Sequence, residues 1–172
     1  TASGLGSFAT GYINTASGHY SQAIGKGAST AGIYGKFAKQ SGTFSNYADA
    51  QLGMFVLRSD TTDATAEALT TNNSAAGTDN QVVLPNSSAY AFHGTIVARQ
   101  KASEGTASAA WKVEGLIRRE GSAGTTVLVN SATTILDNTP SWGMALTADT
   151  TNGSLAITVT GASATNIRWV AT

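Results

Sequence analysis

Residues 1–35, written in lines of seven, read TASGLGS, FATGYIN, TASGHYS, QAIGKGA and STAGIYG. Glycine holds the fourth position of every line, and a small residue holds the second and the seventh. The glycines are Gly4, Gly11, Gly18, Gly25 and Gly32, and the small residues at the second position are Ala2, Ala9, Ala16, Ala23 and Thr30. A period this strict predicts a stack of near-identical units instead of a globular domain with its own closed core.

A seven-residue period is also the signature of a coiled coil, but the residue types exclude that fold. Each glycine in a helix interior costs about 1 kcal/mol relative to alanine, and the small residues cannot supply the Leu and Ile side chains that a helical seam needs. A collagen triple helix is also excluded, because it requires glycine at every third residue. The pattern therefore predicts a short strand followed by a tight turn, repeated along the chain.

The segments Ser7–Gly11, Ser21–Gly25 and Ala28–Gly32 resemble the head repeats of trimeric autotransporter adhesins, which also recur in phage tail fibres. The resemblance implies that two units make one turn of a parallel β-roll and that three chains pack side by side. Gly42 follows Gly32 by ten residues, which predicts a three-residue insertion around residues 37–39. The pattern then fades up to Gly53, so we expect residues 1–53 to form a β-roll stalk whose end tapers.

A homotrimer is also expected on physical grounds. A narrow roll with alanine-sized interior positions buries too little apolar surface to offset a backbone entropy cost of about 1–2 kcal/mol per ordered residue. Such a roll needs neighbouring copies. Thr1 and Ala2 enter the repeat in mid-phase, and we therefore expect the chain to be a fragment of a longer protein.

Composition narrows the range of partners. Ten basic residues balance ten acidic ones, and charged residues are only 12% of the chain, so no electrostatic footprint for nucleic acid or an anionic membrane surface is present. No apolar run approaches the roughly eighteen residues that would span a bilayer. The chain has no cysteine, which excludes disulfides and thiolate metal sites.

From residue 54 to residue 172 the sequence consists of short alternating runs separated by turn residues. This pattern predicts an antiparallel, jelly-roll-like β-sandwich. The longest run places Tyr90, Phe92 and Ile96 on one face. Asn152-Gly153 lies between two alternating runs and predicts a hairpin with a type I′ turn. Further strands are expected near residues 54–57, 81–84, 111–118, 126–136, 144–147, 155–160 and 167–171. The fold class expected for the whole chain is thus all-β and homotrimeric.

Several strings in this region resemble the C-terminal domain of phage and prophage tail-fibre proteins. They are Tyr90–Phe92, SAAWKVEG at 108–115, ADTTNGSLAITVTG at 148–161 and NIRWVA at 166–171. The resemblance implies a place in the virion, in its tail fibre, and it carries no catalytic residues. It leaves open whether this region binds a receptor.

The residues of the chain do not form an enzyme motif. Only His19 and His93 could supply imidazole, and both are expected at the surface. No Gly-x-Ser-x-Gly elbow or P-loop is present, and most carboxylates fall in turns, away from the paired arrangement that glycoside hydrolysis needs. We therefore expect no catalytic residues, no metal and no cofactor, and a protein that is not an enzyme.

One stretch could bind sugar. Trp142 lies in a turn-rich loop with Asn138 and Asp137, where an aromatic ring is expected to be partly exposed, and sugar sites combine an aromatic face with polar side chains. The predicted function is attachment of a virion to a bacterial surface polysaccharide or lipopolysaccharide through a trimeric fibre tip. The alternatives are a purely structural domain that trimerises and caps the fibre, a depolymerising tailspike with its active site upstream, and a bacterial surface adhesin.

Overall fold

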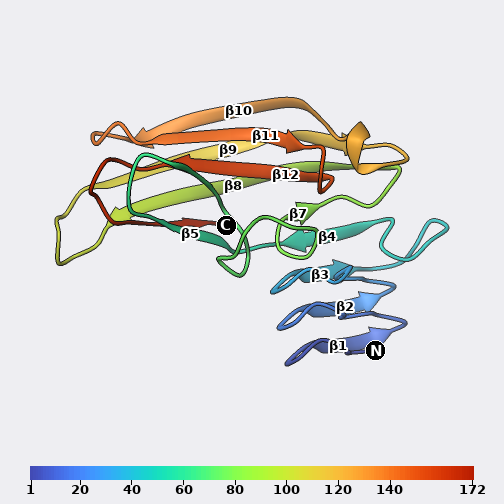
Figure 1. Cartoon of the computed structure of the whole chain (residues 1–172). Coiled ribbons are helices and arrows are strands. Elements are labelled where there is room, and N and C mark those ends of the chain that lie inside the picture. The colour runs from blue at the N-terminus through green and yellow to red at the C-terminus, as the bar shows by residue number, and fades with distance from the viewer. The chain divides into compact units, whose positions relative to one another are not determined.

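The computed structural model describes all 172 residues and confirms the all-β class (Figure 1). The chain divides into two compact units, Thr1–Val56 and Leu57–Thr172. The only helical element is a single 3₁₀ turn, Ala123–Thr125, and the structure contains no helix long and apolar enough to span a bilayer.

The first unit is a β-roll. Strands β1 (Phe8–Tyr12), β2 (Gln22–Lys26) and β3 (Phe37–Gln40) stack in parallel, and the opposite wall of the roll is held by isolated parallel bridges such as Ala2 with Ala16. Phe8 pairs with Gln22, so one coil takes two units of seven residues. Strand β4 (Gln51–Met54) then returns antiparallel to β3 and ends the parallel stack.

The glycines allow the coils to stack closely. A Cβ on Gly4 would collide with the carbonyl oxygen of Gly18, and a Cβ on Gly18 would collide with the carbonyl oxygen of Ile33. On the other wall, a Cβ on Gly11 would collide with the carbonyl oxygen of Gly25. Gly11 also has a φ of +105°, which residues with L side chains rarely adopt. The glycine period is therefore set by backbone contact between successive coils.

Small side chains fill the interior of the roll. Ala16, Ala23, Ala28 and Ala38 form its buried core, with Ala9 packed against them. Of the residues at the seventh position, Asn14 joins two coils: its Nδ2 donates to the carbonyl oxygens of Thr10 (2.5 Å) and Gly25 (2.8 Å), and its Oδ1 accepts from the amide of Ala28 (2.9 Å). Short polar side chains thus replace the larger apolar ones of an ordinary core.

The predicted insertion is wrong in both size and place. Residues 37–39 lie in regular register on β3, and Gln22 pairs with Phe37, so the third coil is longer by one residue only. The extra residue enters at Ala31 and Gly32, which both have positive φ (53° and 78°). Gly18 consequently stacks on Ile33 instead of Gly32. In the sequence the glycine spacing of seven is kept up to Gly32, although the stacking register has already changed there.

The second unit has two antiparallel sheets. The larger contains, in spatial order, β10 (Val127–Asp137), β9 (Ser108–Arg119), β8 (Ser88–Gln100), β13 (Ile167–Ala171) and β5 (Leu57–Thr61). The smaller contains β11 (Gly143–Asp149), β12 (Ser154–Thr160) and β6 (Ala66–Ala68), with β7 (Val82–Val83) also paired to β12. Strand β13 returns after the β11–β12 hairpin to lie beside β8, which is Greek-key order.

Alternation along the strands builds the core as predicted. Ile96, Trp111, Val113 and Ile117 are buried, while His93 and the other alternate residues of β8 are exposed. The hairpin at Asn152-Gly153 is confirmed, but its turn type is wrong. Asp149 pairs with Ser154, so the loop has four residues, and only Gly153 has positive φ (73°).

The carboxylate of Asp149 stabilises this four-residue loop. It accepts hydrogen bonds from the amides of Thr151 (2.8 Å) and Asn152 (2.9 Å) and from the Asn152 side chain (2.8 Å). Burial alone would raise the pKa of Asp149, but these hydrogen bonds, led by those from Asn152, hold it below its usual range.

Candidate functional site

The structure brings the three predicted binding residues into one turn, between β10 and β11. The side chain of Asn138 bonds the backbone of Trp142 twice, through Nδ2 to the carbonyl oxygen (2.8 Å) and through Oδ1 from the amide (2.9 Å). The carboxylate of Asp137 accepts from the amide and the hydroxyl of Thr139. These bonds fix the turn and aim the indole of Trp142.

The predicted exposure of Trp142 is wrong, because its side chain is only 5% exposed. Its ring lies 5.8 Å from that of Trp169, which in turn stacks 5.8 Å from Trp111. The indole nitrogen of Trp169 donates to the hydroxyl of Thr61 (2.9 Å). All three tryptophans thus belong to the core of the second unit. The binding role proposed for Asp137, Asn138 and Trp142 stays a prediction, and in this conformation it rests on the exposed Asp137.

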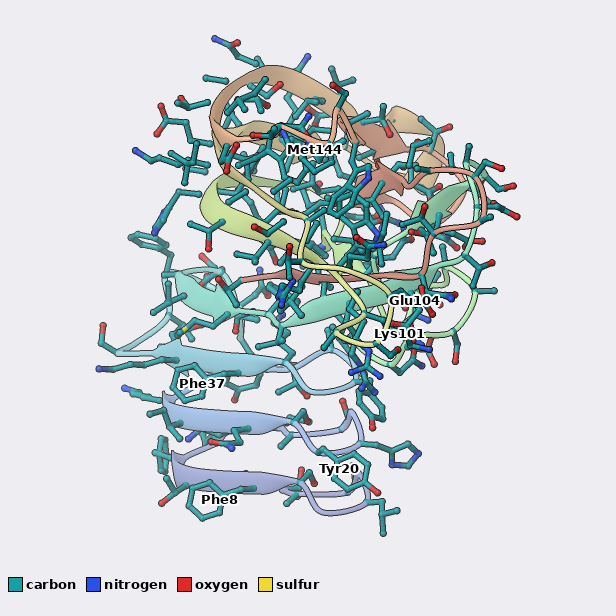
Figure 2. All side chains as sticks on the ribbon, turned by 90° about the vertical axis from the view of Figure 1, so that its left-hand side faces the viewer. Phe8, Tyr20, Phe37, Lys101, Glu104 and Met144 are labelled. Atoms are coloured by element: carbon teal, nitrogen blue, oxygen red, sulfur yellow. The ribbon has the colours of Figure 1, made fainter.

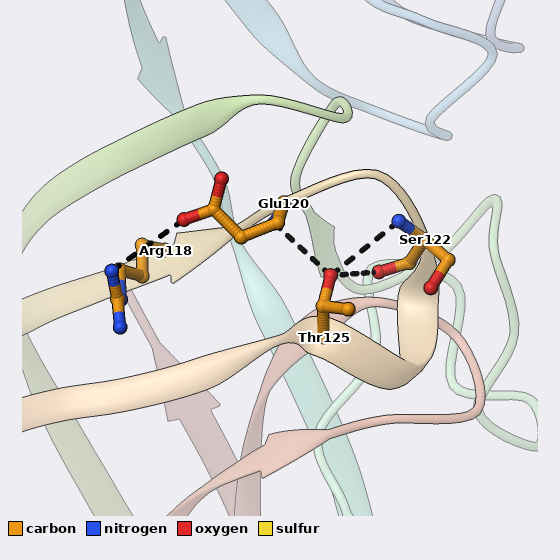
Figure 3. Close-up of polar contacts among 4 residues, drawn as sticks. All are labelled: Arg118, Glu120, Ser122 and Thr125. Atoms are coloured by element: carbon orange, nitrogen blue, oxygen red, sulfur yellow. Dashed lines mark hydrogen bonds and ion pairs between the residues drawn. The ribbon is translucent and has the colours of Figure 1, made fainter.

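The charged residues of the second unit are spread over its surface. Three ion pairs, Lys112–Glu114, Arg118–Glu120 and Arg168–Asp60, join side chains that are each more than half exposed, so they add little stability. Figure 3 shows the Arg118–Glu120 pair (3.5 Å) beside the turn in which the Thr125 hydroxyl donates to the carbonyl oxygen of Ser122 (2.6 Å). The neighbouring Arg119 points the other way and donates to the carbonyl oxygen of Leu84 (2.7 Å).

Two hollows lie on the second unit. One, of about 240 Å³, is polar and has Asp60 and Glu67 in its lining with Asn73 and Ser74. The other, of about 460 Å³, lies between β9 and β10 and is lined mostly by apolar atoms, including Leu116 and Val129. No group of three or more His, Asp or Glu side chains has the arrangement of a metal site.

Strand β10 carries an unusual number of exposed apolar side chains. It lies at the edge of the larger sheet, is interrupted by two bulges and is exposed along nearly all its length. Val127, Val129, Ile135 and Leu136 are 43–61% exposed. A long apolar edge strand is a template for pairing with another chain, and proteins ordinarily cover it.

Exposed apolar side chains of the first unit also lie on the outer side of its sheet. Ala9, Ala23 and Ala38 point into the roll, so their neighbours along the strands point outward. We call this surface the roll face; it consists of Phe8, Thr10, Tyr12, Gln22, Ile24, Lys26, Phe37, Lys39, Leu52 and Met54. Phe8, Leu52 and Met54 are each more than half exposed. Figure 2 shows Phe8 and Phe37 one above the other on this side of the roll.

Lys36 is the one charged side chain of the roll that is fully buried, at 1% exposed. Its Nζ lies 5.7 Å from the centre of the Phe55 ring, a cation–π contact. No carboxylate lies within ion-pair distance of it, so burial lowers the pKa of Lys36 to about 8. The lysine closes the interior of the roll beneath the returning strand β4, where the Cβ position of Gly53 would lie 3.5 Å from its Cε.

Comparison with known proteins gives limited information. No family model matches the chain, and no curated protein matches it. Among solved structures, the tailspike protein of Acinetobacter phage vB_ApiP_P1 overlaps 96% of this chain at 13% identity and a TM-score of 0.35. The tailspike protein of Acinetobacter baumannii phage AM24 overlaps 96% at 11% identity and a TM-score of 0.29. The chain spans 37% and 32% of those two proteins, and TM-scores this low do not establish a shared fold.

Proposed function

We propose that this chain is the distal part of a phage tail fibre, in which three copies form an adhesion module that attaches the virion to a bacterial surface glycan. The observation that carries the proposal is the roll face. The apolar core cluster of the roll consists of alanines, while Phe8, Leu52 and Met54 lie exposed on its outer side. Burying this face between copies supplies the apolar area that the interior lacks.

The resemblance of the repeats to those of trimeric adhesins and tail fibres supports a threefold assembly. The edge strand β10 supports association through the second unit as well, because its exposed apolar residues would be covered by a neighbouring copy. Three copies on one stalk would raise weak individual sugar affinities through their effective concentration. Attachment would then need only modest binding energy at each copy.

The oligomeric state is tested by light scattering. The wild type is expected at three times the 17.4 kDa of one chain. Ile24→Glu places a charge at the centre of the roll face and is expected to lower the mass. Leu5→Glu is the matched control, since Leu5 is 65% exposed and lies outside the roll face, and it should leave the mass unchanged. A wild type that is folded at 17.4 kDa would contradict the trimer.

The binding function needs a separate experiment. The trimer is applied to an array of bacterial polysaccharides and lipopolysaccharides, and its ability to block phage adsorption is measured in parallel. Binding together with blocking supports attachment. A stable trimer that binds nothing on the array and blocks nothing would favour the purely structural role, and release of reducing sugar would favour a depolymerase.

A further inference from the structure

One corner of the roll has a large side chain where its neighbours have none. Gly6, Tyr20 and Gly35 occupy equivalent positions in three successive coils, as the pairing of Phe8 with Gln22 and of Gln22 with Phe37 requires. All three have left-handed backbone, with φ of 62°, 55° and 65°. Glycine adopts this conformation without strain, whereas other L residues are strained in it. Tyr20 therefore occupies a position whose backbone conformation favours glycine.

The ring of Tyr20 is half exposed and held in place by its surroundings. It meets the ring of Tyr34 edge-on, at 5.4 Å between centres and 69° between planes. It also lies against the bare α-carbon of Gly6, where a Cβ would come within 2.9 Å of the ring. Tyr20 is 52% exposed, so two aromatic rings at a steep angle form a fixed open corner.

His19 adds a polar group of known orientation to this corner. Its Nδ1 accepts a hydrogen bond from the amide of Leu5 (2.8 Å), which requires the imidazole proton to lie on Nε2. The side chain is exposed, so the Nε2–H group is a donor for a ligand. The corner thus combines two aromatic rings, two phenolic hydroxyls and an imidazole donor, without a carboxylate or an ammonium group.

We propose that Tyr20, Tyr34 and His19 form a binding site for a neutral pyranose ring. The apolar face of a sugar stacks on an aromatic ring, and its hydroxyls need fixed donors and acceptors nearby. This inference rests on the proposed attachment to a surface glycan and locates it on the stalk. The strain at Tyr20 is then retained because the ring serves recognition instead of folding.

The position of the corner is compatible with the trimer. Figure 2 shows Tyr20 at the right-hand corner of the roll, to the side of Phe8 and Phe37, which belong to the roll face. Burial of the roll face between copies leaves this corner open in each. A trimer would therefore carry three such sites on one stalk.

The test uses Tyr20→Gly in the full chain. Glycine keeps the left-handed backbone, and the strain that it relieves offsets the lost contact with Tyr34. The variant should therefore fold and melt within a few degrees of the wild type. The matched control is Ile13→Gly, at the other corner of the roll. Ile13 also has positive φ (56°) and is 46% exposed, but it lies in no aromatic cluster.

Binding is measured by saturation-transfer NMR with the methyl glycosides of glucose, galactose, mannose and rhamnose. At least one should bind the wild type and Ile13→Gly equally, and Tyr20→Gly should weaken that binding at least tenfold. His19→Ala should weaken it severalfold. Binding that is unchanged in Tyr20→Gly would overturn the site, as would a loss of trimer mass in this variant, which would make the corner a contact between subunits.

The same measurements separate this site from the proposed function. If the wild type binds none of the four glycosides but still binds the polysaccharide array, the Tyr20 site is wrong and the attachment function stands. If it binds neither, the attachment function fails, and the site with it.

Discussion

The roll and the sandwich bury apolar surface in different ways. The sandwich encloses a core of large side chains, including Trp111, Trp142 and Trp169 in mutual contact. The roll encloses alanines and is ordered by backbone contacts and by short polar side chains such as Asn14. Apart from the buried Ile33, its large apolar residues are at least partly exposed. A unit that is highly regular in sequence can thus leave most of its large apolar side chains exposed, while the less regular unit packs them into a core of its own.

Unfolding of the two units can be measured separately, because all three tryptophans lie in the sandwich. Their fluorescence follows unfolding of that unit alone, and hydrogen exchange resolved by peptide follows the roll. Each substitution below is expected to affect one of the two signals and to spare the other.

The largest effect is expected from Gly18→Ala. The added Cβ would collide with the carbonyl oxygen of Ile33, which is backbone and cannot move without separating two coils. We expect a loss of more than about 4 kcal/mol, seen as rapid hydrogen exchange over residues 1–40 with unchanged tryptophan fluorescence. Gly42→Ala is the control, because nothing lies within 4 Å of its Cβ position and its φ is ordinary. Equal protection in the two variants would refute stacking of the coils through glycine.

Trp142→Ala is the corresponding change in the sandwich. Removing a buried indole that packs on Trp169 should cost about 3–5 kcal/mol and lower the melting temperature followed by fluorescence, while exchange in the roll stays slow. Asp137→Ala, in the same turn but exposed, should cost much less. A Trp142→Ala protein that melts like the wild type would place this indole at the surface and restore the sugar-binding role first expected for it.

The sequence predicted those features that depend on local periodicity. Glycine every seven residues predicted the coil, and alternation around Tyr90, Phe92 and Ile96 predicted the inner face of β8. Features set by packing between distant residues were missed. The turn of Trp142 is rich in polar residues, but its ring is buried because Trp169, from the last strand, offers an apolar surface.

The same limit applies inside the roll. The extra residue at Ala31 is invisible in a sequence whose glycine spacing continues through Gly32, because only the partner of Gly18 reveals the change. Tyr20 could have been singled out by its alignment with Gly6, since a large residue at a glycine position marks either strain or function. Its contacts with Tyr34 and Gly6 become visible only in the fold.

A smaller effect, of opposite sign, is expected at Lys36. Its pKa is about 8 in the folded roll and near 10.5 in the unfolded chain, so between these values the unfolded state binds more protons, and the stability of the roll should rise with pH from about 8 to 10.5 and then level off. At neutral pH this difference in pKa lowers the free energy of unfolding of the roll by roughly 3 kcal/mol. Lys36→Met removes the buried charge, keeps the side-chain volume, and should stabilise the roll at pH 7 by up to that amount.

Hydrogen exchange of the roll, corrected for its intrinsic dependence on pH, checks both statements. The wild type should gain protection across the window from pH 8 to 10.5. The difference between Lys36→Met and the wild type should shrink over the same window, because the penalty for burying the Lys36 charge disappears from the wild type. If the methionine variant is less stable than the wild type at pH 7, the ammonium group must have a favourable partner beyond the Phe55 ring. The roll would then contain a buried polar contact whose favourable free energy exceeds the desolvation cost of the ammonium group.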